Sequence, residues 1–328
     1  MLTMITSNVK YEEAAVWQRL WRTSPELIVT AALMVPVLIG ALAGLVIDPR
    51  LITGAPAWLK PAKFASSIMI YTVTLAWIFT RLPEWPRLRR AIGWITAITM
   101  VLEMTIIGTQ AWRGTTSHFN VGTPLDAVLF SLMGAAIVFQ TFSTIAVAVA
   151  LWRHRFEDAS LGWALRLGMT ITIAGALTGG LMTRPTAAQL EAARAGERMT
   201  VAGAHTVGAA DGGPGLIGTG WSTEHGDLRV PHFIGLHAVQ ALPLLVLLLT
   251  RAGIGRAPRE RLMLIAGPSY AGLWVILLIQ ALRGVPAIAP DSATIAQLGA
   301  WAVATALAAG LVRRGNGAAA RQTITISR

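Results

Sequence analysis

Eight apolar runs, each about 20 residues long, divide the 328-residue sequence. A helix rises about 1.5 Å per residue, so a run of this length crosses the roughly 30 Å hydrocarbon core of a bilayer. We therefore expect an all-α integral membrane protein, a bundle of about eight transmembrane helices. The expected spans are 25–47, 62–82, 90–112, 124–152, 161–183, 231–250, 261–282 and 293–312.

The composition excludes several other classes of protein. Hydrophobic residues make up 54% of the chain and charged residues only 13%, which is not the composition of a soluble domain. The formal charge of +11 would suit a nucleic-acid partner, but nearly every Lys and Arg lies in a short gap between apolar runs. We expect a lipid bilayer as the partner and no nucleic acid.

Cysteine is absent from the sequence. This excludes disulfides, covalent c-type haem attachment, iron-sulfur clusters, thiolate zinc sites and a cysteine nucleophile. Any metal must therefore be held by histidine, carboxylate, methionine or backbone groups.

The distribution of basic residues predicts the topology. Of the 27 Lys and Arg residues, 18 lie on the side of the two termini and 9 on the other side. The positive-inside rule then places both termini in the cytoplasm, in the cell (inner) membrane. We expect residues 1–24 to form a cytoplasmic amphipathic helix on the membrane surface, because residues 11–22 alternate charged and apolar groups. Residues 25–312 hold the spans, and 313–328 form a cytoplasmic tail.

One long extracytoplasmic loop, 184–230, separates the fifth and sixth expected spans. Thr186 and Gln189 have the spacing of a capping box, which predicts a short helix that stops at Gly196. The segment 210–220 is too rich in glycine for a helix or a strand and is expected to form an ordered or mobile lid. His205 and His225 are expected to be solvated on this loop.

Glu103 is the only carboxylate in the middle of an expected span. Its charge is costly in hydrocarbon, so it must be neutral, paired with a cation such as Lys63, or bound to a metal. Glu103 and Gln110 share one helix stripe, and Glu103 lies about 13 Å from the outer end of its span. His237 lies about 9 Å from its own outer end, so we expect the two to meet in an outward-facing pocket.

Histidines on the outer side are the candidate ligands of a cofactor. His118 with either His232 or His237 could ligate haem b, or with Glu103 a non-haem metal ion. On a regular helix His232 and His237 would lie about 140° apart, so only one of them need face a site. The expected catalytic residues are Glu103, Lys63 and Gln110; the expected cofactor-binding residues are His118, His232, His237, Asn120, Gln240, Arg113 and Arg229; the expected metal ligands are His118, His237 and Glu103.

Three functions fit these residues. The first is a haem- or metal-dependent oxidoreductase that acts on a quinone or another lipid-soluble substrate. The second is a proton-coupled transporter in which Glu103 and His237 titrate. The third is a non-catalytic subunit of a membrane complex, and a homo-oligomer is an open alternative. The structural alternative is an interhelical hydrogen bond for Glu103 and His237, and close helix packing for the small residues from Gly175 to Gly179.

Overall fold

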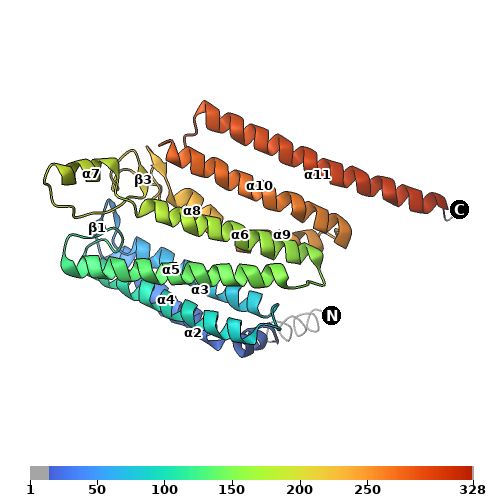
Figure 1. The fold of residues 1–328 in the computed structure, drawn as a ribbon, viewed down its shortest axis with the longest axis horizontal. Coiled ribbons are helices and arrows are strands. Elements are labelled where there is room, and N and C mark those ends of the chain that lie inside the picture. Colours follow the sequence, from blue (N-terminus) through green and yellow to red (C-terminus); the bar gives the residue numbers. More distant parts are fainter. Residues whose placement is uncertain (1–14, 327–328) are drawn as a thin grey trace. The chain divides into compact units, whose positions relative to one another are not determined.

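The structure is a computed structural model that describes residues 15–326 (Figure 1). Within these residues, seven helices are long and apolar enough to cross a membrane, and a bent pair of helices makes an eighth if it is counted as one span. Almost no sheet is present in the described chain. The predicted all-α multi-span membrane fold is therefore confirmed.

The chain divides into two compact units, described separately here. Unit 1 comprises residues up to Ala146 together with Met199–Val201, and unit 2 comprises Val147–Arg198 and the residues from Ala202 onward. Helix α5 begins in unit 1 and ends in unit 2. The elements of the first part of the chain are α2 (Pro25–Ile47), β1 (Leu51–Ile52), β2 (Ala55–Pro56), α3 (Leu59–Phe79), α4 (Pro86–Arg113) and α5 (Pro124–Arg153).

Unit 2 contains six further helices and one two-stranded antiparallel sheet. Its first helix, α6, begins where the Asp158 side chain accepts hydrogen bonds from the amides of Ser160 and Leu161. Its elements are α6 (Ala159–Met182), α7 (Ala187–Arg194), β3 (Thr206–Val207), β4 (Gly226–Asp227), α8 (Arg229–Leu236), α9 (Ala238–Arg251), α10 (Arg256–Leu282) and α11 (Ser292–Ile326).

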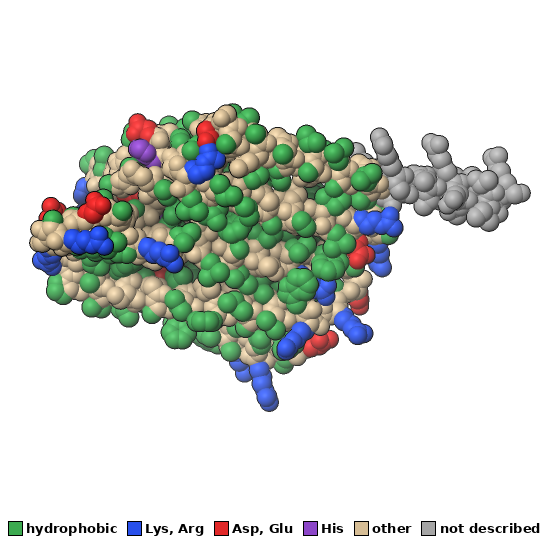
Figure 2. All heavy atoms as spheres, turned by 45° about the horizontal axis from the view of Figure 1, so that its top comes forward, with side chains coloured by type: hydrophobic (Ala, Val, Ile, Leu, Met, Phe, Trp, Pro, Cys, Tyr) green, Lys and Arg blue, Asp and Glu red, His purple; other side chains and the backbone are tan. Residues whose placement is uncertain are grey.

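The surface has the character of a protein in lipid. Hydrophobic side chains cover much of the face drawn in Figure 2. Residues 15–23 are helical, and Val16, Trp17 and Trp21 on this helix are about half exposed. The remainder of the predicted N-terminal amphipathic helix, residues 1–14, lies outside the described residues, and its place on the membrane surface stays a prediction.

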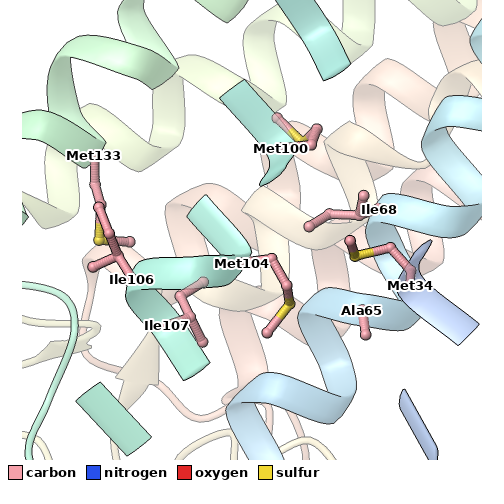
Figure 3. Close-up of a cluster of buried hydrophobic side chains, with 8 residues drawn as sticks. All are labelled: Met34, Ala65, Ile68, Met100, Met104, Ile106, Ile107 and Met133. Carbon is pink, nitrogen blue, oxygen red and sulfur yellow. The ribbon is translucent and has the colours of Figure 1, made fainter. Parts of the chain in front are cut away.

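Methionine side chains fill much of the interior of unit 1, where α2, α3 and α4 pack against one another. Figure 3 shows this cluster. Methionine is unbranched and flexible, so it fills irregular gaps between helices. Two of the methionines, Met100 and Met104, lie within one turn of Glu103 on α4. The cluster consists of Met34, Ala65, Ile68, Met100, Met104, Ile106, Ile107 and Met133.

Glycines allow α6 and α8 to cross closely in unit 2. A Cβ atom added at Gly175 would lie 2.6 Å from the backbone of Gly235, so neither position has room for a side chain. Small residues at such crossings let helix backbones approach in a membrane. The sequence-based interpretation of Gly175 as a packing residue agrees with this geometry.

The span expected at 231–250 is not a regular helix. It breaks at His237 into α8 and α9, which meet at a bend of 48°. The Tyr270 hydroxyl donates to the carbonyl of Ile234 at 2.7 Å, and the Thr172 hydroxyl donates to the carbonyl of Leu236 at 3.1 Å. The expected separation of about 140° between His232 and His237 assumed one regular helix; the span breaks at His237, and the separation stays a prediction.

The long loop is folded. Thr186 and Gln189 form the predicted capping box, and the short helix they start, α7, ends before Gly196, whose φ of +88° suits glycine. The glycine-rich segment turns back on itself, because the amide of Leu216 donates to the carbonyl of Trp221 at 2.8 Å. Its action as a lid stays a prediction.

The close crossing of α6 and α8 can be tested with two glycines of one helix. We expect Gly175→Ala to lower the free energy of unfolding by about 1–3 kcal/mol, because the new Cβ meets backbone atoms that cannot move aside. Gly180→Ala is the matched control, since a Cβ there meets nothing within 4 Å. Thermal unfolding in detergent compares the two, and equal stability would contradict the close crossing.

Candidate functional site

Glu103 lies in the interior of unit 1. Its side chain belongs to α4, the residue is 2% exposed, and its Oε1 atom has no hydrogen-bond partner. The Lys60 ammonium group, on the first turn of α3, acts on this carboxyl electrostatically. The sequence named Lys63 as the catalytic cation, one turn further along the same helix. Lys60 is thus a residue that the sequence analysis left out of the site, and the role of Lys63 stays a prediction.

His118 lies among aromatic rings in the loop that follows α4. Its ring packs edge-on against Phe64 of α3, with centroids 5.8 Å apart, and its Nδ1 atom lies 3.1 Å from the Ser117 hydroxyl. The Lys60 ammonium lies 5.9 Å from the centroid of the same Phe64 ring. We call Lys60, Phe64, Glu103 and His118 the Glu103 site.

Three predicted site residues at and after the C-terminal end of α4 are bonded within the protein. The Gln110 side chain donates to Asp126 at 2.8 Å, and Arg113 forms an ion pair with the same carboxylate at 2.7 Å. The Asn120 amide donates to the Thr115 hydroxyl at 2.9 Å. These bonds join α4, its following loop and the start of α5, so they account for all three side chains structurally. Their catalytic and cofactor-binding roles stay predictions.

His232 is fixed in orientation at the crossing of α8 and α6. Its Nδ1 atom lies 2.7 Å from the carbonyl oxygen of Gly175, so Nδ1 carries the proton and donates. A Cβ atom at Gly179 would lie 3.3 Å from Cε1 of the ring, so glycine here keeps that edge of the imidazole clear. In a neutral imidazole held this way, Nε2 is the nitrogen that can accept a proton or bind a metal.

His237 stands at the break between α8 and α9. Its ring lies 4.2 Å from that of Phe233, and Gln240 is a side-chain hydrogen-bond partner. Gln240 was expected to orient a histidine, and the hydrogen bond fits that expectation. Glu103 and His237 belong to different units, so their meeting in one pocket stays a prediction.

Two charged pairs organise the long loop. Arg229 binds the fully buried Asp227 side chain through both its amide and its guanidinium, and also donates to the carbonyl of Gly220 at 2.6 Å. Arg229 is therefore engaged in holding the loop. The sequence predicted a solvated His205, and this prediction is wrong. The Nδ1 atom of His205 lies 2.6 Å from Asp211, and only 21% of the side chain is exposed.

No group of three or more His, Asp or Glu side chains within residues 15–326 is arranged to hold a metal ion. The predicted set of His118, His237 and Glu103 draws on both units and stays a prediction. No family model matches the chain, and neither the curated proteins nor the solved structures contain a match.

The His205–Asp211 contact predicts a pH dependence of the loop. Burial by itself would raise the pKa of the Asp211 carboxyl, but hydrogen bonds from the His205 ring and from the His205 and Thr206 amides, with the His205 charge, lower it well below its ordinary value. Because the folded pKa is below the unfolded one, the carboxylate stabilises the loop fully above about pH 4, and this contribution is lost as the pH falls toward the folded pKa.

Hydrogen exchange of the His205 and Thr206 amides, corrected for intrinsic rates, measures this effect. We expect protection to persist from about pH 7 to about pH 4 and to fall at least about tenfold at lower pH. Asp211→Asn should lose that protection already at neutral pH. Protection that is equal in the wild type and in Asp211→Asn would contradict a stabilising role for the carboxylate.

Proposed function

We propose that this protein is an integral-membrane oxidoreductase that acts on a lipid-soluble substrate of the quinone class. The observation that carries the proposal is the carboxyl of Glu103, which is 2% exposed in the middle of a membrane span and has an unpartnered oxygen. A buried polar atom without a partner is costly in hydrocarbon, so its retention favours a ligand that completes it.

The residues linked to Glu103 through Lys60 suit a quinone headgroup. Conversion of a quinone to a quinol takes up two electrons and two protons, and a carboxyl group is a proton donor that works without bulk water. The Phe64 ring offers an apolar face for stacking, and the His118 imidazole offers a hydrogen-bonding group beside it. Lys60 balances the charge of Glu103 when the proton has been given up.

An electron-transfer centre is part of this proposal. Without cysteine, its ligands come from imidazole, carboxylate or methionine, which suits haem b or a non-haem metal ion. Of the histidines predicted as ligands, His237 is the one proposed here, and Gln240 positions it.

We also propose that the site opens to the extracytoplasmic side of the cell membrane. The basic residues that favour the cytoplasm lie at the termini and in the gaps between α3 and α4, α5 and α6, and α9 and α10. Lys60, Arg113 and His118 lie at the opposite ends of the helices from these gaps. A substrate dissolved in the bilayer would then reach Glu103 from the outer leaflet.

The broken span gives a reason to weigh a proton-coupled transporter. Transporters often bind ions with the carbonyl oxygens exposed where a helix unwinds. Here the carbonyls of Ile234 and Leu236 already accept hydrogen bonds from Tyr270 and Thr172. The break therefore offers no free pair of carbonyls at these positions, and the oxidoreductase is the better proposal.

The test uses purified full-length protein and a short-chain quinone. Tryptophan fluorescence quenching measures binding, and the absorbance of the quinone measures its reduction by protein that has been reduced chemically. We expect Glu103→Gln to keep binding within a few-fold but to slow quinol formation about 100-fold or more, since a positioned acid contributes that much. Glu224→Gln is the control, because Glu224 is exposed on the loop.

A visible spectrum and a metal analysis of the same sample examine the electron-transfer centre. We expect a haem spectrum or a stoichiometric metal ion. A wild-type protein that is colourless, free of metal and unable to bind the quinone would contradict the proposal and favour a non-catalytic subunit of a membrane complex.

A further inference from the structure

Two histidines of unit 2 carry the supporting contacts that are typical of metal ligands. The Nδ1 atom of His205 lies 2.6 Å from the Asp211 carboxylate, and that of His232 lies 2.7 Å from the Gly175 carbonyl oxygen. Ligating histidines almost always donate their second ring N–H to a carboxylate or a backbone carbonyl, which fixes the ring and directs the other nitrogen at the metal. In both residues the ligand nitrogen would therefore be Nε2.

The backbone brings these two residues to the start of α8. Strand β3 pairs with β4 so that Thr206 lies opposite Asp227, and the amide of Leu228 donates to the carbonyl of His205 at 3.0 Å. The amide of His232 in turn donates to the carbonyl of Leu228 at 3.1 Å. His232 therefore lies one helical turn after Leu228, the residue whose amide is hydrogen-bonded to the His205 carbonyl.

Neighbouring groups hold the Asp211 carboxylate in place beside His205 and leave space beside the His232 ring. The backbone amides of His205 and Thr206 also donate to Asp211, at 3.0 Å and 2.9 Å, so the carboxylate is held by three groups of one turn. Glycine at 179 puts no Cβ atom against Cε1 of the His232 ring, where one would lie at 3.3 Å. The charge of His205 also acts on the His232 imidazole, which agrees with their proximity.

We infer that His205 and His232 form a two-histidine site for a divalent transition-metal ion of the kind that prefers imidazole, such as Cu²⁺ or Zn²⁺. Water or an added ligand completes the coordination, since no third His, Asp or Glu of the described chain is arranged with them as a ligand. Asp211 and the Gly175 carbonyl orient the rings without touching the ion. The site stands on unit 2 alone and holds whether or not the Glu103 site binds a quinone.

Copper(II) is the probe for this site, because Cu²⁺ binds most tightly of the divalent first-row ions and reports its nitrogen ligands in electron paramagnetic resonance. The full-length protein is titrated with Cu²⁺ in the absence of quinone. We expect one bound ion with two imidazole nitrogens, which Zn²⁺ displaces in competition. His205→Ala and His232→Ala should each remove one nitrogen from the spectrum and weaken binding at least about 100-fold.

Two further variants make the experiment decisive. His225→Ala, in the same loop, should leave the two-nitrogen spectrum and the affinity unchanged. Asp211→Asn keeps both imidazoles but removes the carboxylate, and should weaken Cu²⁺ binding about 10- to 100-fold. A wild-type spectrum without two nitrogens, wild-type affinity in either His205→Ala or His232→Ala, or loss of the ion in His225→Ala would overturn the site.

Loss of copper binding would leave the quinone test at Glu103 untouched, and failure of quinone binding would leave the copper result untouched. The two proposals can therefore fail separately.

Discussion

The absence of water from the bilayer interior decides how this protein is built. Each backbone N–H and C=O in a span must find a partner within the protein, since each unsatisfied group costs several kcal/mol. The break at His237 shows how the rule is met where a helix is interrupted. Tyr270 from α10 and Thr172 from α6 hydrogen-bond the carbonyls of Ile234 and Leu236, so the bend is held by side chains from two other helices.

The same rule separates structural from functional polar residues. Gln110, Arg113 and Asp126 satisfy one another between the end of α4 and the start of α5, and Arg229 and Asp227 do so at the start of α8. These groups are consistent with a role in stability alone. Glu103 differs, because its carboxyl is buried and one of its oxygens has no hydrogen bond. This unpartnered buried carboxyl is therefore the strongest argument for a ligand in the membrane interior.

The sequence predicted the features that depend on local periodicity. The length of the apolar runs predicted the spans, and the spacing of Thr186 and Gln189 predicted the start of α7. The break at His237 could not be predicted, because the carbonyl of Ile234 beside it is held by Tyr270, which is 36 residues away from Ile234 in the chain. Whether a helix breaks depends on such tertiary partners as much as on its own residues.

The candidate site could be predicted only in part, because it too depends on contacts between residues that are distant in the chain. Burial of Glu103 follows from its position in an apolar run, but Lys60 and Lys63 both lie at the start of α3, and their spacing alone did not indicate that Lys60 acts on the carboxyl. The pairing of His205 with Asp211 depends on a turn next to the β3–β4 pair. Composition alone describes that segment as a glycine-rich loop, so the proposed two-histidine site could be inferred only from the fold.

Infrared difference spectroscopy of the Glu103 carboxyl tests the central claim most directly. The spectrum is recorded before and after a quinone analogue is added to the membrane-embedded protein. If the unpartnered oxygen of Glu103 contacts the ligand, the carboxyl C=O band shifts on binding, and the shift is absent from Glu103→Gln. A ligand that binds without changing any carboxyl band, or that gives the same change in Glu103→Gln, would contradict the account.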